Sequence, residues 1–231
     1  MEPKMLYCIR HGESTYNEWR RQSFLNFSWL WVRDPMLVDA PLSIKGRQQT
    51  ELLHDEINAR CLQERIELII TSPLTRAVQT MTGGFRDADI PILLEPLCRE
   101  MLDTACDIGR QPEELAASFV TVNADFHALE SFWWLPPGKR PSGAAAQHAY
   151  EAPRTRAEVA PLRESSADVD GRIRALVAKL DALPQTRIAL VGHSAFFKRL
   201  LGMGRKLNNC ELVEVPFAEV AQRFGIAPRD A

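Results

Sequence analysis

Several features that would mark a specialised class of protein are missing from this sequence of 231 residues. No stretch approaches the ~20 consecutive apolar residues of a transmembrane helix, so we expect no membrane span. Lysine and arginine (28) nearly balance aspartate and glutamate (30), and a formal net charge of −2 provides no overall field toward nucleic acid or an acidic membrane. Residues 1–4 lead directly into an apolar run, which predicts no signal peptide and favours a cytoplasmic protein.

Cysteine and histidine are too scattered for a disulfide framework or a metal site. The five cysteines are odd in number and form no Cys-x-x-Cys pair: Cys8, Cys61, Cys98, Cys106 and Cys210. Three histidines show no metal-ligand spacing with one another or with a cysteine: His54, His127 and His148. We therefore expect buried free thiols in a reducing compartment, and neither a metal nor another cofactor.

What remains is an ordinary globular composition, 45% hydrophobic and 25% charged. Strands are predicted at five apolar or alternating runs: residues 6–9, 68–71, 90–94, 187–191 and 211–215. Helices are predicted at four places: residues 44–61, residues 169–183, a helix that begins at Ser72-Pro73, and a helix directly after Gly192-His193-Ser194. This alternation predicts a single α/β domain over residues 1–231, with three layers: a mostly parallel sheet and helices on both faces.

Two segments do not follow this alternation. Residues 24–38 are rich in aromatic side chains without a clean period, and residues 136–161 are rich in proline, glycine, alanine and arginine. We expect the aromatic run over residues 24–31 and the pair Trp133-Trp134 to pack in the core or in the cap region rather than to contact substrate. We expect residues from about 103 to 163 to form an inserted helical and loop region that covers the functional site.

Basic and imidazole side chains follow three of the predicted strands at the point where each strand ends. Arg10-His11 follows the first strand, a helix carrying Arg76 follows the second, and His193 follows the fourth. Because ligands collect at the carboxyl ends of the strands in an open parallel sheet, we expect these side chains to share one rim. Guanidinium groups bind phosphate oxygens in pairs, and a neutral imidazole can attack phosphorus. The rim therefore predicts a site for a phosphate dianion.

Transfer of a phosphoryl group also needs an acid that protonates the departing oxygen. The segment after the third predicted strand offers Glu100 for this role, with Glu95 as the nearer competitor in sequence.

These residues resemble the motifs of the histidine phosphatase superfamily, which has the phosphoglycerate mutase-like fold. Four stretches carry the resemblance in the family's order: Arg10-His11-Gly12-Glu13, Ser72 to Thr80, Leu97 to Glu100, and Val191-Gly192-His193-Ser194. The resemblance implies that His11 is the nucleophile and that Glu100 is the general acid and base. It implies phosphate binding by four residues: Arg10, Asn17, Arg76 and His193.

The stretch over residues 101–109 departs from the Arg-His-Tyr-Gly setting that is typical of cofactor-dependent mutases, and this departure favours hydrolysis. We therefore predict a phosphatase that hydrolyses phosphomonoesters through a phosphohistidine intermediate. Two alternatives remain open: a phosphoglycerate mutase-type phosphotransferase, and a non-catalytic module that binds a phosphorylated ligand. The expected partner is a small phosphorylated substrate, with no nucleic acid and no membrane, and the sequence is compatible with an oligomer.

Overall fold

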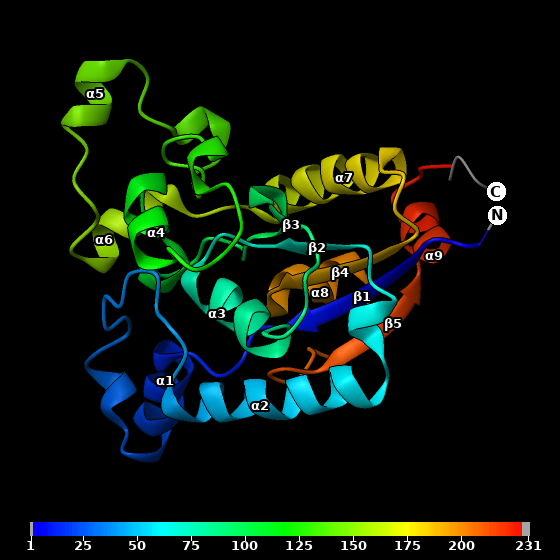
Figure 1. Ribbon diagram of the computed structural model, residues 1–231. Helices are drawn as coiled ribbons and strands as arrows, with labels where there is room; N and C mark the ends of the chain where they lie inside the picture. The colour runs from blue at the N-terminus through cyan, green and yellow to red at the C-terminus, as the bar shows by residue number, and fades with distance from the viewer. Residues whose placement is uncertain (1, 228–231) are drawn as a thin grey trace.

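The computed structural model describes residues 2–227, which contain one five-stranded sheet in the order β3-β2-β4-β1-β5 (Figure 1). The strands are β1 (Met5–Arg10), β2 (Leu68–Thr71), β3 (Ile92–Leu94), β4 (Arg187–Gly192) and β5 (Leu212–Pro216). Neighbouring strands are parallel except β5, which pairs antiparallel with β1 at one edge. This pairing confirms the predicted mostly parallel sheet, and each of the five predicted runs overlaps one strand.

Helices cover both faces of this sheet, as predicted. Alternate residues of β1 point to opposite faces, so Tyr7 and Ile9 join one core while Leu6 and Cys8 join another. The first core includes side chains of α2 (Ile44–Ala59) and α3 (Thr75–Gly84); the second includes side chains of α7 (Ser166–Ala182), α8 (Ser194–Leu200) and α9 (Phe217–Arg223). Figure 1 shows α2 and α3 below the sheet and α7 above it. The two cores explain why the central strands are apolar throughout.

The start of α3 differs from the prediction that Ser72-Pro73 begins the helix. The helix begins at Thr75, because Ser72 to Leu74 form a turn in which the Ser72 hydroxyl accepts a hydrogen bond from the Leu74 amide (3.3 Å). No side chain of the turn caps the helix; instead Asp39, from a distant loop, accepts the Thr75 amide (2.8 Å). The other predicted helices lie where the periodicity places them.

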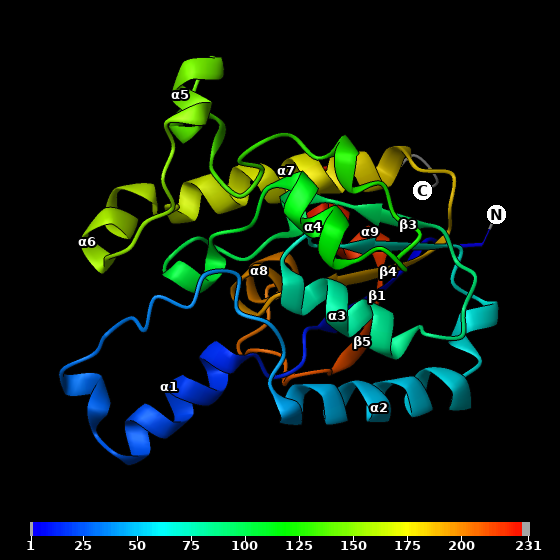
Figure 2. The same ribbon diagram turned by 60° about the vertical axis from the view of Figure 1, so that its left-hand side comes forward.

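The helix α1 (Thr15–Leu25) follows β1 and was not predicted from the sequence. A short 3-10 turn, η1 (Ser28–Leu30), comes after it. Figure 2 shows α1 and η1 extending away from the body of the molecule. The expectation of interior packing is correct for Trp133 and Trp134, which are buried. It is wrong for the aromatic run over residues 24–31, which begins in the last turn of α1 and whose large apolar side chains are exposed.

The region over residues 103–163 consists of loops, 3-10 turns and the short helices α4 (Pro112–Ser118), α5 (Ala144–His148) and α6 (Arg156–Val159). Its two ends meet: the Glu164 amide donates to the Leu102 carbonyl (3.0 Å), and the Leu102 amide donates to the Glu164 carboxylate (3.0 Å). Arg99 and Arg172 also bind this buried carboxylate, at 2.5 Å and 3.0 Å. We call this contact the Leu102–Glu164 junction.

Within residues 2–227, none of the helices combines the length and the apolar character that crossing a membrane requires.

Candidate active site

One cavity of about 380 Å³ lies where the predicted strand exits meet. Five of the six residues singled out from the sequence line it: Arg10, His11, Asn17, Arg76 and Glu100. The sixth, His193, is fully buried and lies against His11, with their ring centroids 5.1 Å apart. Parallel pairing explains the convergence, because β1 and β4 run in register from Met5 and Arg187 to Arg10 and Gly192.

His11 stands at the end of β1 with its ring fixed by one hydrogen bond. Its Nδ1 lies 2.6 Å from the carbonyl oxygen of Gly12, which can only accept, so Nδ1 carries the proton and Nε2 carries the free lone pair. Burial, together with the charges of Arg76 and Arg10, holds the pKa of His11 well below its usual value. A neutral imidazole with a free Nε2 is the form that can act as a nucleophile.

His193 precedes the first turn of α8 and faces His11 from β4. Burial, together with the charge of Arg76, holds the pKa of His193 well below its usual value, so this ring is also neutral. Among the described residues, neither of its ring nitrogens has a hydrogen-bond partner. An imidazole with both nitrogens unsatisfied is unusual in a protein interior and is suited to an oxygen-rich ligand beside it.

Two arginines place guanidinium groups in the cavity. Arg10 donates through Nη1 to the Leu207 carbonyl (2.6 Å), while its buried Nε has no partner among the described residues. Arg76 lies in the first turn of α3 and donates to the Cys106 carbonyl (2.5 Å) and to Asp107 (2.9 Å). Burial works against the charge of Arg76, but the negative groups around it outweigh burial and raise its pKa. The cavity is therefore cationic where a phosphate would bind.

Asp107 is a site residue that the sequence reading missed. It is buried, lines the cavity and pairs with Arg76, and burial raises its pKa to about 6. Its Oδ2 also accepts hydrogen bonds from the Thr104 amide and hydroxyl (3.2 and 3.3 Å), which fix the turn before it. A Thr-x-x-Asp capping pattern over residues 104–107 was the available sequence signal.

Glu100 and its sequence competitor Glu95 lie in different places. The Glu100 carboxylate lines the cavity and accepts the backbone amides of Ala195 (3.1 Å) and Phe196 (3.1 Å) in the first turn of α8. Glu95 instead pairs with Lys179 and lines a second cavity beside β3. Of these two glutamates, Glu100 is the one that the fold brings into the cavity with the arginines.

Asn17 lines the cavity from the first turn of α1, where it also completes a capping box. Its Oδ1 accepts the Ser14 amide (3.2 Å), and the Ser14 hydroxyl accepts the Asn17 amide (3.1 Å). Tyr16 and Arg20 reach the cavity from the same helix and were not identified from the sequence. Within residues 2–227, no three His, Cys, Asp or Glu side chains are grouped so that they could hold a metal ion.

A family model described as histidine phosphatase superfamily (branch 1) matches residues 6–148 of this chain. The chain belongs to the histidine phosphatase superfamily. Two curated relatives of this family member illustrate the range of similarity. A probable phosphatase of Schizosaccharomyces pombe is 32% identical over 124 residues, and the match covers half of each chain. A phosphoglycerate mutase-like protein of Arabidopsis thaliana is 25% identical over 254 residues, covering 90% of this chain and 82% of the relative.

Solved structures agree with this histidine phosphatase fold. A putative α-ribazole-5′-P phosphatase from Escherichia coli superposes with a TM-score of 0.54 at 17% identity, covering 91% of this chain and 89% of that one. A mycobacterial glucosyl-3-phosphoglycerate phosphatase gives a TM-score of 0.51 at 20% identity, covering 92% and 90%. At these identities the likeness concerns the fold.

Proposed function

We propose that this chain is a phosphatase that hydrolyses small phosphomonoesters through a phosphohistidine at His11. The observation that carries the proposal is the state of the His11 ring. It is neutral, its Nδ1 is bound to the Gly12 carbonyl, and its Nε2 is free in a cavity that also holds Arg10 and Arg76. Family membership supports the same chemistry.

In the first half of the reaction, the Nε2 lone pair of His11 attacks phosphorus and the bond from phosphorus to the ester oxygen breaks. Arg10 and Arg76 bind the non-bridging oxygens and offset their charge, and the single N–H of the neutral His193 ring donates a further hydrogen bond to one of them. Asn17 contributes a further contact from α1.

The departing alkoxide takes a proton from Glu100, which lines the same cavity. In the second half, Glu100 removes a proton from water as the water oxygen attacks phosphorus. The bond to His11 breaks, inorganic phosphate forms, and the neutral imidazole is restored.

Three further features fit this function. The volume of about 380 Å³ is that of a site for a small ligand. Residues 103–107 contribute four lining side chains, which supports the role of the inserted region over residues 103–163 as a cover for the site. Four of the five cysteines are buried and all five are free, which fits a reducing cytoplasmic environment.

The test is rapid alkaline quench during turnover of a labelled phosphomonoester, with acid treatment of the trapped protein afterwards. The expected adduct is labile in acid, stable in alkali, and located on His11. His11→Asn should remove both the adduct and the turnover, whereas His54→Asn should remove neither. His54 is a matched control, since it is also buried with Nδ1 on a backbone carbonyl but lies outside the cavity.

An adduct on serine or cysteine, or none at any quench time, would overturn the proposed mechanism. The same experiment separates the mutase alternative, in which label on His11 passes to a second substrate molecule instead of appearing as inorganic phosphate. A non-catalytic module would bind phosphate without forming any adduct.

A further inference from the structure

The most exposed apolar surface of the molecule is a short protrusion with no role in the proposed chemistry. Of the eleven large apolar side chains that are exposed within residues 2–227, seven lie in residues 24–32, which we call the apolar tip. Leu25 is 74% exposed and Trp31 is 79% exposed. Exposed apolar side chains gathered in one patch mark a surface that binds something apolar.

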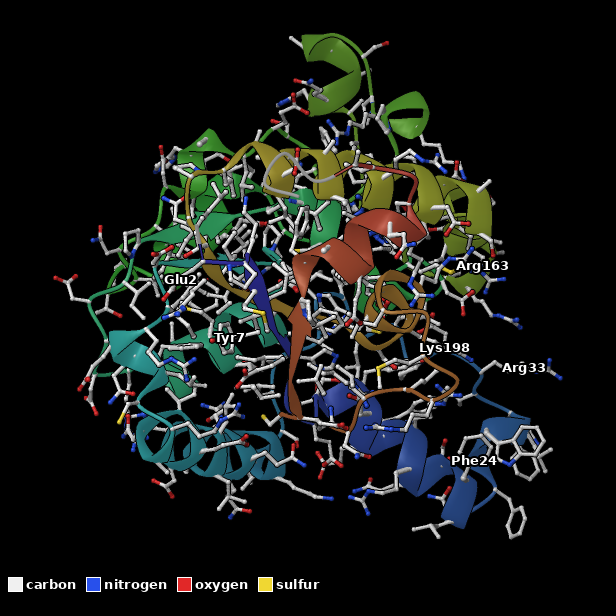
Figure 3. The ribbon with its side chains drawn as sticks, turned by 90° about the vertical axis from the view of Figure 1, so that its right-hand side faces the viewer. Glu2, Tyr7, Phe24, Arg33, Arg163 and Lys198 are labelled. Carbon is white, nitrogen blue, oxygen red and sulfur yellow. The ribbon has the colours of Figure 1, made fainter. Side chains whose placement is uncertain are left out.

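The shape of the apolar tip is convex. It consists of the last turn of α1 and the 3-10 turn η1, and Figure 2 shows both beyond the body of the molecule. Figure 3 shows Phe24 and the rings beside it at the outer edge of the molecule. Phe27 holds a left-handed backbone conformation (φ 60°), which is costly for an aromatic residue, and its ring is nevertheless exposed.

The charge around the tip differs from that of the whole chain. Residues 20–33 contain three arginines, Arg20, Arg21 and Arg33, and no acidic residue, although the chain carries a net charge of −2. All three arginines are exposed, and Arg21 also approaches Glu13 (3.7 Å). The next acidic residue, Asp34, is turned inward and accepts the backbone amides of Met36 (2.9 Å) and Ala105 (2.9 Å). The tip is therefore apolar at its end and cationic at its base.

We infer that the apolar tip docks this protein on the surface of an anionic phospholipid bilayer. Tryptophan, phenylalanine and leucine enter the boundary between headgroups and acyl chains, while arginines beside them bind lipid phosphates. This docking concerns one local surface, so it is compatible with the balanced charge of the rest of the chain. It does not depend on the reaction proposed for the cavity.

A second copy of the chain fits this surface less well. A stable dimer needs roughly 800 Å² of complementary surface from each partner, and a convex tip offers no flat or concave face for it. In a two-fold contact the same surface patch is used by both copies, which brings the arginines of both tips into one interface. A lipid surface, in contrast, closes around a convex tip and supplies the opposite charge.

Docking would also place the candidate active site near the lipid. α1 carries Tyr16, Asn17 and Arg20 at the cavity and Leu25 at the tip. Eight residues of α-helix separate Asn17 from Leu25, a rise of roughly 12 Å. The cavity mouth would thus lie roughly 12 Å from the part of the tip that enters the lipid.

The test uses the full chain and vesicles of phosphatidylcholine with roughly 30% phosphatidylserine, compared with phosphatidylcholine alone. Cosedimentation should show binding that is stronger with phosphatidylserine and weaker at high salt. Leu25→Ser and Trp31→Ser should each lower the partition coefficient by about tenfold. Val120→Ser is the matched control, since Val120 is 80% exposed outside the tip and should leave the partition coefficient unchanged.

The charge contribution has its own pair of variants. Arg33→Gln should lower binding to the phosphatidylserine vesicles by roughly fivefold and leave binding to pure phosphatidylcholine unchanged. Arg174→Gln, at another exposed arginine, should change neither. Vesicles should also shift the fluorescence of Trp29 and Trp31 to shorter wavelength. Turnover of a soluble phosphomonoester should be unchanged in Trp31→Ser, which separates this test from that of the proposed function.

Three results would overturn the inference. One is absence of binding to either vesicle. Another is binding that Leu25→Ser, Trp31→Ser and Val120→Ser leave equally intact. The third is concentration-dependent self-association in analytical ultracentrifugation that Trp31→Ser abolishes, which would assign the tip to a contact between copies.

Discussion

The hydrogen bond between His11 Nδ1 and the Gly12 carbonyl decides which ring nitrogen is free, and it depends on a single peptide group. The sequence indicated this residue and the arginines because strand exits in a parallel sheet share a rim. It did not indicate Asp107, since its contact with Arg76 spans 31 residues and depends on how the turn after Thr104 folds. Neither that long-range contact nor the burial of the carboxylate is visible in local periodicity.

Three carboxylate side chains line the cavity, those of Glu100, Asp103 and Asp107. A pair of substrates tests whether Glu100 is the proton donor. Glu100→Gln should slow hydrolysis of an alkyl phosphate by ~10²–10⁴-fold and that of nitrophenyl phosphate far less, because nitrophenolate leaves without a proton. Arg76→Ala should slow both substrates similarly, since each presents the same phosphoryl group. Steady-state kcat/KM for the two substrates provides the measurement.

Asp107→Asn is the matched control for this experiment. If Asp107 donates the proton, Asp107→Asn should slow hydrolysis of the alkyl phosphate far more than hydrolysis of nitrophenyl phosphate. The rate of the unmodified protein would then fall as the pH rises through about 6, where Asp107 ionises. If Asp107 only positions Arg76, Asp107→Asn should affect both substrates alike and leave their ratio unchanged.

At the scale of elements, the loop after β1 and the first turn of α2 are in very close contact. A Cβ added to Gly46 would lie 2.0 Å from the carbonyl oxygen of Glu13. Ser43 adds two bonds to the same residue, through its amide to the Glu13 carbonyl (2.8 Å) and through its hydroxyl to the carboxylate (3.1 Å). The start of α2 therefore positions the loop that contains Gly12.

Gly46→Ala should lower the free energy of unfolding by ~1–3 kcal/mol, because backbone must move to admit the methyl group. It should also reduce kcat/KM, since a displaced loop moves the Gly12 carbonyl that orients His11. Gly171→Ala in α7 is the control: nothing lies within 4 Å of its added Cβ, so the helix should gain up to ~1 kcal/mol. Urea unfolding and steady-state kinetics measure both effects, and equal behaviour of the two variants would contradict this account.

The failure to predict α1, the exposure of the aromatic run and the start of α3 each has a physical reason. Along α1, Ser23 is buried while Phe24 and Leu25 are exposed, so the helix lacks the apolar stripe that periodicity detects. The aromatic run was expected to pack because large apolar side chains usually do. The start of α3 was misplaced because its cap, Asp39, is 36 residues away in the chain.

At the scale of the whole molecule, the sheet was predictable because its strands are short apolar runs bounded by turns. Layer assignment followed from the alternation of strands and helices. The arrangement of residues 103–163 was not predictable, since its turns and short helices are fixed by contacts with distant segments, such as the hydrogen bond that the Ala105 amide donates to the Asp34 carboxylate.

The two buried neutral histidines make stability depend on pH. Each has a folded pKa well below its unfolded value of about 6.5, so below that pH the unfolded chain binds protons that the folded chain does not. The free energy of unfolding is therefore highest, as far as these two histidines decide it, above pH 6.5, and it decreases as the pH falls below that value. His193→Asn should flatten the decline in unfolding free energy between pH 6.5 and 5 by up to ~1.4 kcal/mol per pH unit.

Denaturant unfolding at a series of pH values measures this slope. His148→Asn, at an exposed histidine, should leave the slope unchanged. Asp107 has a raised folded pKa, so between pH 6 and 4 it increases the free energy of unfolding as the pH falls, opposite to the histidines. Because Asp107 is present in both variants, its effect cancels when they are compared. An unchanged slope in His193→Asn would show that His193 is charged in the folded protein.

The Leu102–Glu164 junction has a consequence for how proteins of this kind can diversify. The segment over residues 103–163 leaves and rejoins the α/β fold at one place, so its length can change without shifting the register of the sheet. Because residues 103–107 supply part of the cavity wall, exchange of this region between relatives would replace that wall, while Asp34 and Arg76, which bind it from outside the region, would stay. Recombination at the Leu102–Glu164 junction would alter substrate preference in one step, while the histidines and arginines at the strand ends remain in place.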